Sequence, residues 1–199
     1  MRRLVLLLLP IILLSLAGCG GEDRTTEKAE MTELDAAGAP APDSTTAYPI
    51  QSRGVYGIQV GDTFEEGSDR LEAGTLENGE GTFDVHYILA RDGQRLGYFM
   101  PALEDPARVG DITITSPEAA TEAGIRVGDP FSKLQIAYPN MRINGSEVES
   151  RTYAFVDDYA FRLDTANGPG GVDPNKVPAK TKIVEIVVID QTMGDALEI

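Results

Sequence analysis

The sequence contains GIQVGDTF at Gly57–Phe64 and GIRVGDPF at Gly124–Phe131, at an offset of 67 residues. Six of the eight residues are identical. In each copy Ile and Val alternate with a polar residue, as in a short half-buried strand. The glycine that follows permits a tight turn. We therefore interpret the octapeptide as the start of a structural unit that occurs twice.

The second half of each octapeptide predicts the start of a short helix. Asp62 and Asp129 are of the residue type that caps a helix by accepting its free N–H bonds. Asp62 and Glu65 have the spacing of a capping box. In the second copy, Pro130 falls at the first helical position and Pro139 ends the helix. We predict that Asp62 and Asp129 are structural helix caps, with paired functional carboxylates as the alternative.

Segments of alternating polarity follow each predicted helix and indicate antiparallel strands joined by tight turns. These segments are 82–90, 95–100 and 110–115 in the first copy, and 151–156, 159–163 and 182–189 in the second. The pattern predicts an α+β fold of two tandem helix-plus-antiparallel-strand units, at about 55–116 and 122–191. We expect the units to form one largely antiparallel sheet with short helices packed on one face.

This tandem arrangement resembles beta-lactamase-inhibitor-like domains and outer-membrane assembly-lipoprotein-like domains. The second half is similar to an uncharacterised bacterial lipoprotein family regulated by the RpoE envelope-stress sigma factor. AGIRVGDPFSKLQIAYPN, YAFVDDYAFRLD, a GPGG loop and KIVEIVVI occur in that order. The resemblance covers roughly residues 70–190. It implies the repeated fold unit and a location in the envelope, and it supplies no catalytic or binding residues.

The N-terminus has the features of a lipoprotein signal peptide. The positive start Met1–Arg3 precedes an apolar run, Leu4–Leu16, which is shorter than the about 20 residues of a membrane span. The sequence Leu16–Cys19 resembles the lipobox, in which the chain is cut before a cysteine that then carries lipid. We predict a signal peptide over residues 1–18 and a membrane anchor on Cys19. Because Gly20 and not Asp follows, we expect the outer membrane.

Residues 19–47 predict a lipidated disordered tether, because they are rich in Thr, Ala, Glu, Asp and Pro and have no hydrophobic period. Residues 48–199 then form the globular domain. Without the signal peptide the chain has 15 Lys and Arg against 32 Asp and Glu, a net charge of −17. This charge argues against nucleic acid as a partner. It favours a cationic partner in the envelope, or it serves solubility alone.

His86 is the only histidine in the chain. On the strand predicted at 82–90 it shares a face with Asp84, opposite Phe83 and Val85, and we predict that it faces solvent. A zinc site needs three or four ligands, which one histidine and one lipidated cysteine do not supply. No serine with a recognisable base accompanies it, so we predict no catalytic residues.

The loop at 164–178 is rich in glycine and proline. Asp164, Asn167 and Asp173 carry oxygen ligands of the type that calcium takes, but their spacing does not match an EF-hand. The alternative is a long connection in which Gly and Pro make turns. We predict no cofactor, and these three residues remain candidate calcium ligands.

These features predict an envelope-anchored, non-catalytic lipoprotein. Its domain, facing the periplasm or the exterior, binds a protein or another envelope component. One alternative is a periplasmic inhibitor of a cationic hydrolase such as lysozyme, since negative charge raises the rate of such an association. The other is a cell-wall or lipid hydrolase that uses carboxylates, although no two carboxylates are placed at the separation that glycoside hydrolysis requires.

Overall fold

The computed structural model describes residues 48–189. Its elements in chain order are β1 (Tyr48–Gln51), β2 (Gly54–Val55), β3 (Ile58–Gln59), β4 (Leu71–Asn78), β5 (Gly81–Leu89), β6 (Arg95–Pro101), β7 (Val109–Ile114), β8 (Ala119–Thr121), α1 (Phe131–Ala137), β9 (Arg142–Gly145), the 3-10 helix η1 (Val148–Ser150), β10 (Arg151–Val156), β11 (Tyr159–Ala166), β12 (Gly170–Gly171), the 3-10 helix η2 (Pro174–Lys176) and β13 (Ile183–Val188). The predicted signal peptide, Cys19 and the tether lie outside the described residues.

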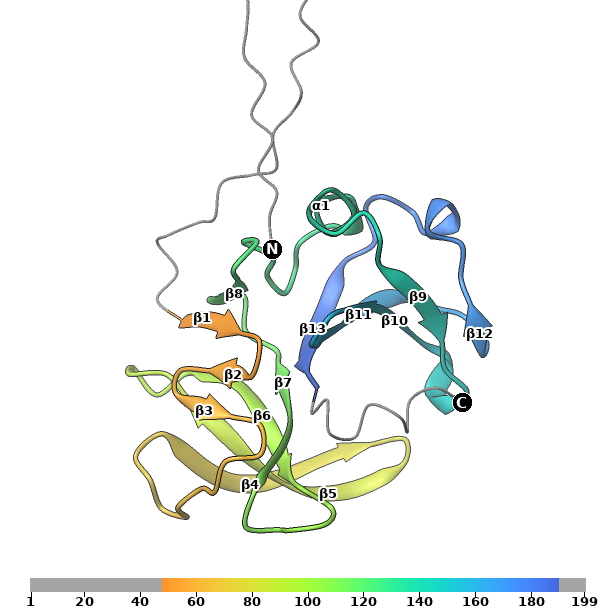
Figure 1. The fold of residues 1–199 in the computed structure, drawn as a ribbon. Helices are drawn as coiled ribbons and strands as arrows, with labels where there is room; N and C mark the ends of the chain where they lie inside the picture. The colour runs from red at the N-terminus through yellow and green to blue at the C-terminus, as the bar shows by residue number, and fades with distance from the viewer. Residues whose placement is uncertain (1–47, 190–199) are drawn as a thin grey trace, which may run out of the picture. The chain divides into compact units, whose positions relative to one another are not determined.

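The strands form two sheets. The smaller has the order β3-β2-β1-β8, and the larger has nine strands in the order β12-β9-β10-β11-β13-β7-β6-β5-β4. In the larger sheet β4 to β7 form one antiparallel meander, and β9, β10, β11 and β13 form another. The antiparallel pair β7–β13 joins them at the centre. In Figure 1 the two halves curve away from this pair, with α1 beside the second half and β1 to β3 beside the first.

One row of side chains crosses both halves and defines the core face of the large sheet. Register places its members opposite one another on successive strands: Leu71, Ile88, Gly97, Ile114, Ile186, Phe161, Ala154 and Ile143. Apolar residues of α1, such as Phe131 and Leu134, and of β1 to β3, such as Ile50, belong to the same buried cluster. The two halves therefore share one hydrophobic core.

The two octapeptides have the same structural role. In each, the backbone pairs with the start of the last strand of its half. Gly61 N donates to Val109 O at 2.8 Å, and Gly128 N donates to Ile183 O at 2.7 Å. Val109 N and Ile183 N donate in return to the carbonyl oxygens of Asp62 and Asp129, each at 2.9 Å.

A cation completes the contact in both halves. Arg108 Nη1 donates to Gly61 O at 2.7 Å, and Lys182 Nζ donates to Gly128 O at 2.9 Å. Both cations lie on the partner strand segment, next to the residue that pairs with the glycine. The repeated octapeptide thus forms a backbone pairing site for the last strand of its half, β7 or β13. This role depends on contacts with a distant part of the chain, so the octapeptide sequence alone does not predict it.

The predicted α+β class of helix-plus-strand repeats is wrong, because the described residues are mostly β and contain one α-helix. That helix, α1, follows Phe131 as predicted. No helix follows Phe64; the chain turns through residues 65–70 and enters β4. Leu71, seven residues after Phe64, is the first residue of this strand. The strong pairing of β4 with β5 over eight residues replaces the expected helix.

The predicted helix caps are also corrected. The N-cap of α1 is Pro130, which makes no side-chain cap hydrogen bond. Asp129 Oδ2 instead accepts from Arg126 N at 2.8 Å and from Lys133 Nζ at 2.9 Å. Asp62 precedes no helix and its side chain is exposed. The two aspartates share a backbone role, and only Asp129 has a structural side-chain role.

We therefore expect Asp129→Ala to lower the free energy of unfolding by about 1–2 kcal/mol, because it removes a carboxylate that accepts two hydrogen bonds. The matched change Asp62→Ala should cost less than about 0.5 kcal/mol, as for an exposed surface residue. Urea unfolding followed by circular dichroism measures both. Equal losses at the two positions would contradict the different roles assigned to the two side chains.

Candidate functional site

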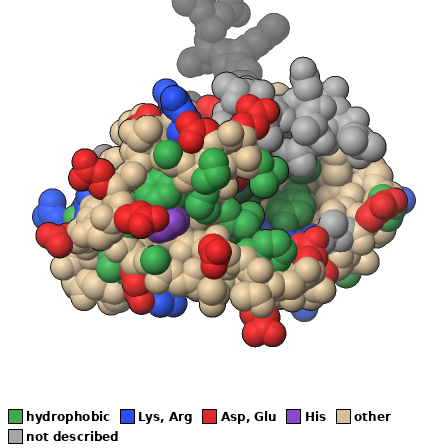
Figure 2. Space-filling view, turned by 90° about the horizontal axis from the view of Figure 1, so that it is seen from below, with side chains coloured by type: hydrophobic (Ala, Val, Ile, Leu, Met, Phe, Trp, Pro, Cys, Tyr) green, Lys and Arg blue, Asp and Glu red, His purple; other side chains and the backbone are tan. Residues whose placement is uncertain are grey.

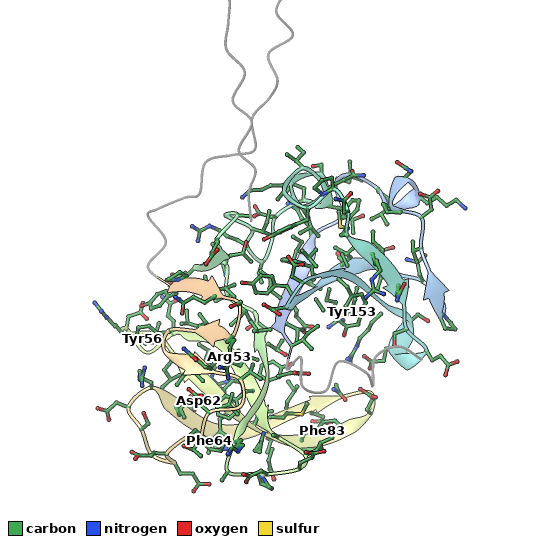
Figure 3. All side chains as sticks on the ribbon, viewed as in Figure 1. Arg53, Tyr56, Asp62, Phe64, Phe83 and Tyr153 are labelled. Atoms are coloured by element: carbon green, nitrogen blue, oxygen red, sulfur yellow. The ribbon has the colours of Figure 1, made fainter. Side chains whose placement is uncertain are left out.

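The face of the large sheet opposite the core carries aromatic side chains from both halves. We define the aromatic face by Phe83, Tyr98, Tyr153 and Phe155, which are all half-buried and lie outside the core cluster. Tyr98 and Phe155 lie in one cross-strand row through Thr113, Val187 and Ala160. Figure 3 labels Phe83 on the first half and Tyr153 on the second. The curved sheet thus presents aromatic rings from both halves on one side.

The side chains of β10 that point to the core determine which of its residues lie on the aromatic face. Thr152 and Ala154 are buried on the core face, and Ala154 lies opposite Phe161. The large residues Tyr153 and Phe155 therefore lie on the other face, with ring centroids 6.1 Å apart. In a strand, successive side chains point to opposite faces, so the small residues on the core face place two aromatic residues outside it.

The charged residues beside the aromatic rings are paired with one another. Arg162 and Glu185, which lie opposite each other on β11 and β13, form an ion pair at 3.1 Å. Arg151 is ion-paired with Glu149 and lies 3.9 Å from Glu80. Two arginines thus stand against three carboxylates, so no cation beside the rings is left without an acidic partner.

Arg151 also lies near the β4–β5 turn of the first half of the sheet. Glu80 is in the β4–β5 turn, and Glu149 Oε1 accepts from Gly79 N of the same turn at 3.0 Å. The hydrogen bond from Arg151 lowers the pKa of Glu149. The Nε atom of Arg151 is buried and has no hydrogen-bond partner among the described residues.

Burial is the main cause that raises the pKa of Tyr98, and the charge of Glu185 acts in the same direction. The phenol therefore stays protonated as a hydrogen-bond donor at neutral pH, with Thr113 as a side-chain partner. Tyr87 lies on the same side of the sheet but turns toward β4, where its hydroxyl donates to Thr75 O at 2.9 Å. The aromatic face thus combines apolar rings with a few phenolic donors.

Seen from below, hydrophobic side chains gather in the middle of the molecule, and Asp and Glu side chains are spread around them (Figure 2). Large hydrophobic residues that are clearly exposed also occur elsewhere. They are Met100 on β6, Leu103 in the β6–β7 connection and Ile136 on α1, with Leu103 at 91% exposure. Leu103 and Ile136 lie on a loop and on the helix, and neither belongs to the aromatic face.

The prediction that His86 faces solvent is wrong. The side chain is buried, at 9% exposure. Its ring stacks on Phe99 with centroids 5.2 Å apart, and the ring of Phe64 lies 4.6 Å away. Phe64 belongs to the first octapeptide, which folds over the strand and covers a position that local alternation assigns to solvent. No carboxylate of the described residues hydrogen-bonds to the His86 ring.

The three candidate calcium ligands have different surroundings in the structure. Asp173 Oδ1 accepts from Asn175 N at 2.9 Å and caps η2, and Asn167 Nδ2 donates to Thr152 Oγ1 at 2.9 Å. Asp164 is exposed on β11. Asn167 and Asp173 line a pocket of ≈ 290 Å³, together with Thr165 and Lys176.

Within residues 48–189 no group of three or more His, Cys, Asp or Glu is arranged to hold a metal ion. Calcium binding at the 164–178 loop stays a prediction. The same part of the chain contains no helix that is both long enough and apolar enough to cross a membrane.

Sequence reasoning missed Arg151, Arg162 and Glu185. The available signal was the alternation in β10 and β11. In β10 Arg151 shares its parity with Tyr153 and Phe155, whereas in β11 Arg162 alternates with Tyr159 and Phe161. That signal was ambiguous, because the two strands place their aromatic residues differently relative to their arginines.

No protein-family model matches the chain, and a search of curated proteins finds no match. Among solved structures, the chain is similar to the crystal structure of the uncharacterized protein yfeY from Escherichia coli, with a TM-score of 0.44 and 13% sequence identity. The match covers 71% of this chain and 99% of that chain. It is a distant structural likeness.

Proposed function

We propose that the protein is a non-catalytic envelope lipoprotein, anchored through lipid on Cys19, whose aromatic face binds an apolar segment of a partner protein. The observation that carries the proposal is the set of half-buried aromatic side chains that lie outside the core, next to charges that are already paired. Aromatic residues are the most frequent anchors of protein interfaces. A face whose arginines are already ion-paired suits a segment without acidic residues.

The location of Arg151 also supports this function. Its ion pairs with Glu149 and Glu80 and its hydrogen bond with Tyr153 hold the side chains beside the aromatic face in place before a partner binds. The high negative charge of the whole chain would raise the encounter rate with a cationic partner, while the aromatic face supplies the contacts that hold it.

We expect Tyr153→Ala to weaken binding of the partner by about tenfold or more, which is the effect of truncating an aromatic anchor at an interface. A photo-crosslinking residue at Phe155 in living cells captures the partner, and binding is then measured with the purified components. Ile136 is the matched control, because it is also an apolar side chain with access to solvent but lies on α1. Ile136→Ala should leave the affinity unchanged.

The same cells test the anchor. Cys19→Ser should move the protein out of the membrane fraction and reduce capture of a membrane-bound partner. A photo-crosslinking residue at position 136 serves as the control for position 155. Equal capture from the two positions contradicts the aromatic face as the binding surface, and so does an affinity that Tyr153→Ala leaves unchanged. Identification of the captured protein as a cationic hydrolase, inhibited on binding, would favour the inhibitor alternative.

A further inference from the structure

The strand β4 is a long edge of the nine-stranded sheet. Its eight residues, Leu71–Asn78, pair with β5 in an uninterrupted register. Within residues 48–189 β4 pairs with no other strand. The opposite edge is β12, which has only two residues, Gly170 and Gly171. Of the two edges, β4 alone has the length to accept a further strand.

Hairpin geometry identifies the backbone groups on the open edge. Asn78 and Gly81 close the β4–β5 turn over two intervening residues, and the closing pair of such a hairpin exchanges hydrogen bonds. Every second residue before Asn78 likewise bonds to β5. The backbone groups of the residues between them, Ala73, Thr75 and Glu77, therefore point away from β5. Two contacts agree with this parity, since Leu71 N donates to Ser68 O at 2.9 Å and Thr75 O accepts from Tyr87 Oη.

Natural proteins protect exposed edges with proline, lysine or a bulge. Strand β4 contains neither proline nor lysine, and its register with β5 shows no shift. Its charged residues are Glu72 and Glu77, and the turn before it adds Glu65, Glu66 and Asp69, all exposed. The same turn contains one cation, Arg70, whose Nη1 donates to Tyr56 O at 2.9 Å. Glu72 is paired with Arg95 at 3.1 Å, so the acidic charge of the edge is only partly compensated.

This charge selects between two kinds of incoming strand. A second copy of the chain brings the same glutamates and a net charge of −15, and like charges on adjacent strands are destabilising. A cationic segment brings the opposite charge to Glu77 and to the preceding turn. The edge therefore resists self-association while it accepts a basic extended chain.

We propose that β4 is a docking edge that binds an extended cationic polypeptide segment as an additional strand. Main-chain hydrogen bonds to Ala73 and Glu77 and to the N–H of Thr75 supply the pairing, since Thr75 O already accepts from Tyr87 Oη, and the acidic side chains select a basic sequence. This surface is distinct from the aromatic face. The two proposals can fail independently, because each is tested by substitutions at different residues.

The probe is a capped peptide of alternating lysine and valine, as long as β4, with a glutamate–valine peptide of equal length as the control. We expect the chain to bind the lysine peptide, and Thr75→Pro to weaken this binding by about tenfold, because proline removes one outward N–H that the added strand needs. Thr75→Val keeps the N–H and should bind as the native chain does. Calorimetry measures the affinities, and added salt should lower them through screening.

Two further variants keep the test decisive if Thr75→Pro fails to fold. Glu77→Lys should weaken binding of the lysine peptide several-fold. Glu122→Lys, an equal charge change at an exposed residue near Tyr138 and Tyr159 of the second half, should have a smaller effect. Phe155→Ala should have none. The proposal is overturned if the lysine peptide does not bind, or if the glutamate peptide binds equally well. It is also overturned if neither Thr75→Pro nor Glu77→Lys alters the binding. A native dimer that Thr75→Pro dissociates would identify a second copy as the occupant and also overturn it.

Discussion

Phe161→Ala is expected to lower the free energy of unfolding by about 3–5 kcal/mol, the cost of removing a fully buried aromatic ring. Phe161 is 0% exposed and lies in the cross-strand row between Ile186 and Ala154. The rings of Tyr138 and Tyr159 surround it, with centroids at 5.9 and 6.0 Å. Since its neighbour in the row is already an alanine, the substitution leaves two small residues side by side and a cavity that the row does not fill.

Phe155→Ala is the matched control. Phe155 lies on the neighbouring strand, is of the same residue type and is half-buried on the aromatic face. Its truncation should cost about 1 kcal/mol, because less apolar area leaves contact with the protein. Urea unfolding followed by circular dichroism measures both variants. Similar losses would mean that the two faces of the sheet have been assigned the wrong way round.

The sequence predicted most of the central strands, because their polarity alternates and turn residues mark their ends. The segment 151–156 coincides with β10, and 82–90 differs from β5 by a single residue at each end. Both strands of each predicted hairpin pair as expected. The helix after Phe131 was also predicted, since Pro130 and Pro139 fix its limits.

Strand β4 was not predicted, because its sequence LEAGTLEN has little strand propensity of its own. Leu, Glu and Ala favour helix, and Asp62 with Glu65 imitates a capping box. Pairing with β5 decides the outcome instead, and this pairing is a tertiary contact that a local window does not contain. For the same reason the docking role of the octapeptides was hidden, since Val109 and Ile183 are far away in sequence.

The candidate site could be predicted only in part. The alternation predicted for 151–156 places Tyr153 and Phe155 on one face of β10. It does not say which face is buried. Large aromatic residues are normally assigned to the core, whereas the structure buries Thr152 and Ala154, because Phe161 and α1 already fill that space. The ion pairs of Arg151 and Arg162 required the register between strands.

Gly97→Ala is expected to cost about 3 kcal/mol or more, an overpacking effect at the upper end of the usual range. In a strand, alanine is ordinarily more stable than glycine by roughly 0.5–1 kcal/mol, so the expected sign is opposite to the intrinsic preference. A methyl group at Gly97 would lie 2.1 Å from the carbonyl oxygen of Thr113 and 2.8 Å from the Cα of Ile114. These atoms belong to the backbone of β7 and cannot turn away.

The position of Gly97 explains why the effect should reach both halves. It is the member of the core row that lies between Ile88 and Ile114, and Ile114 pairs with Ile186 across the β7–β13 junction. A displaced β7 therefore disturbs the strand pair that joins the two meanders. Gly168→Ala is the control, because a methyl group there meets nothing within 4 Å, and it should be neutral or stabilise by about 0.4–1 kcal/mol. A Gly97→Ala protein with native stability would show that β6 and β7 are not packed this closely. The continuous core row across the two halves would then be contradicted as well.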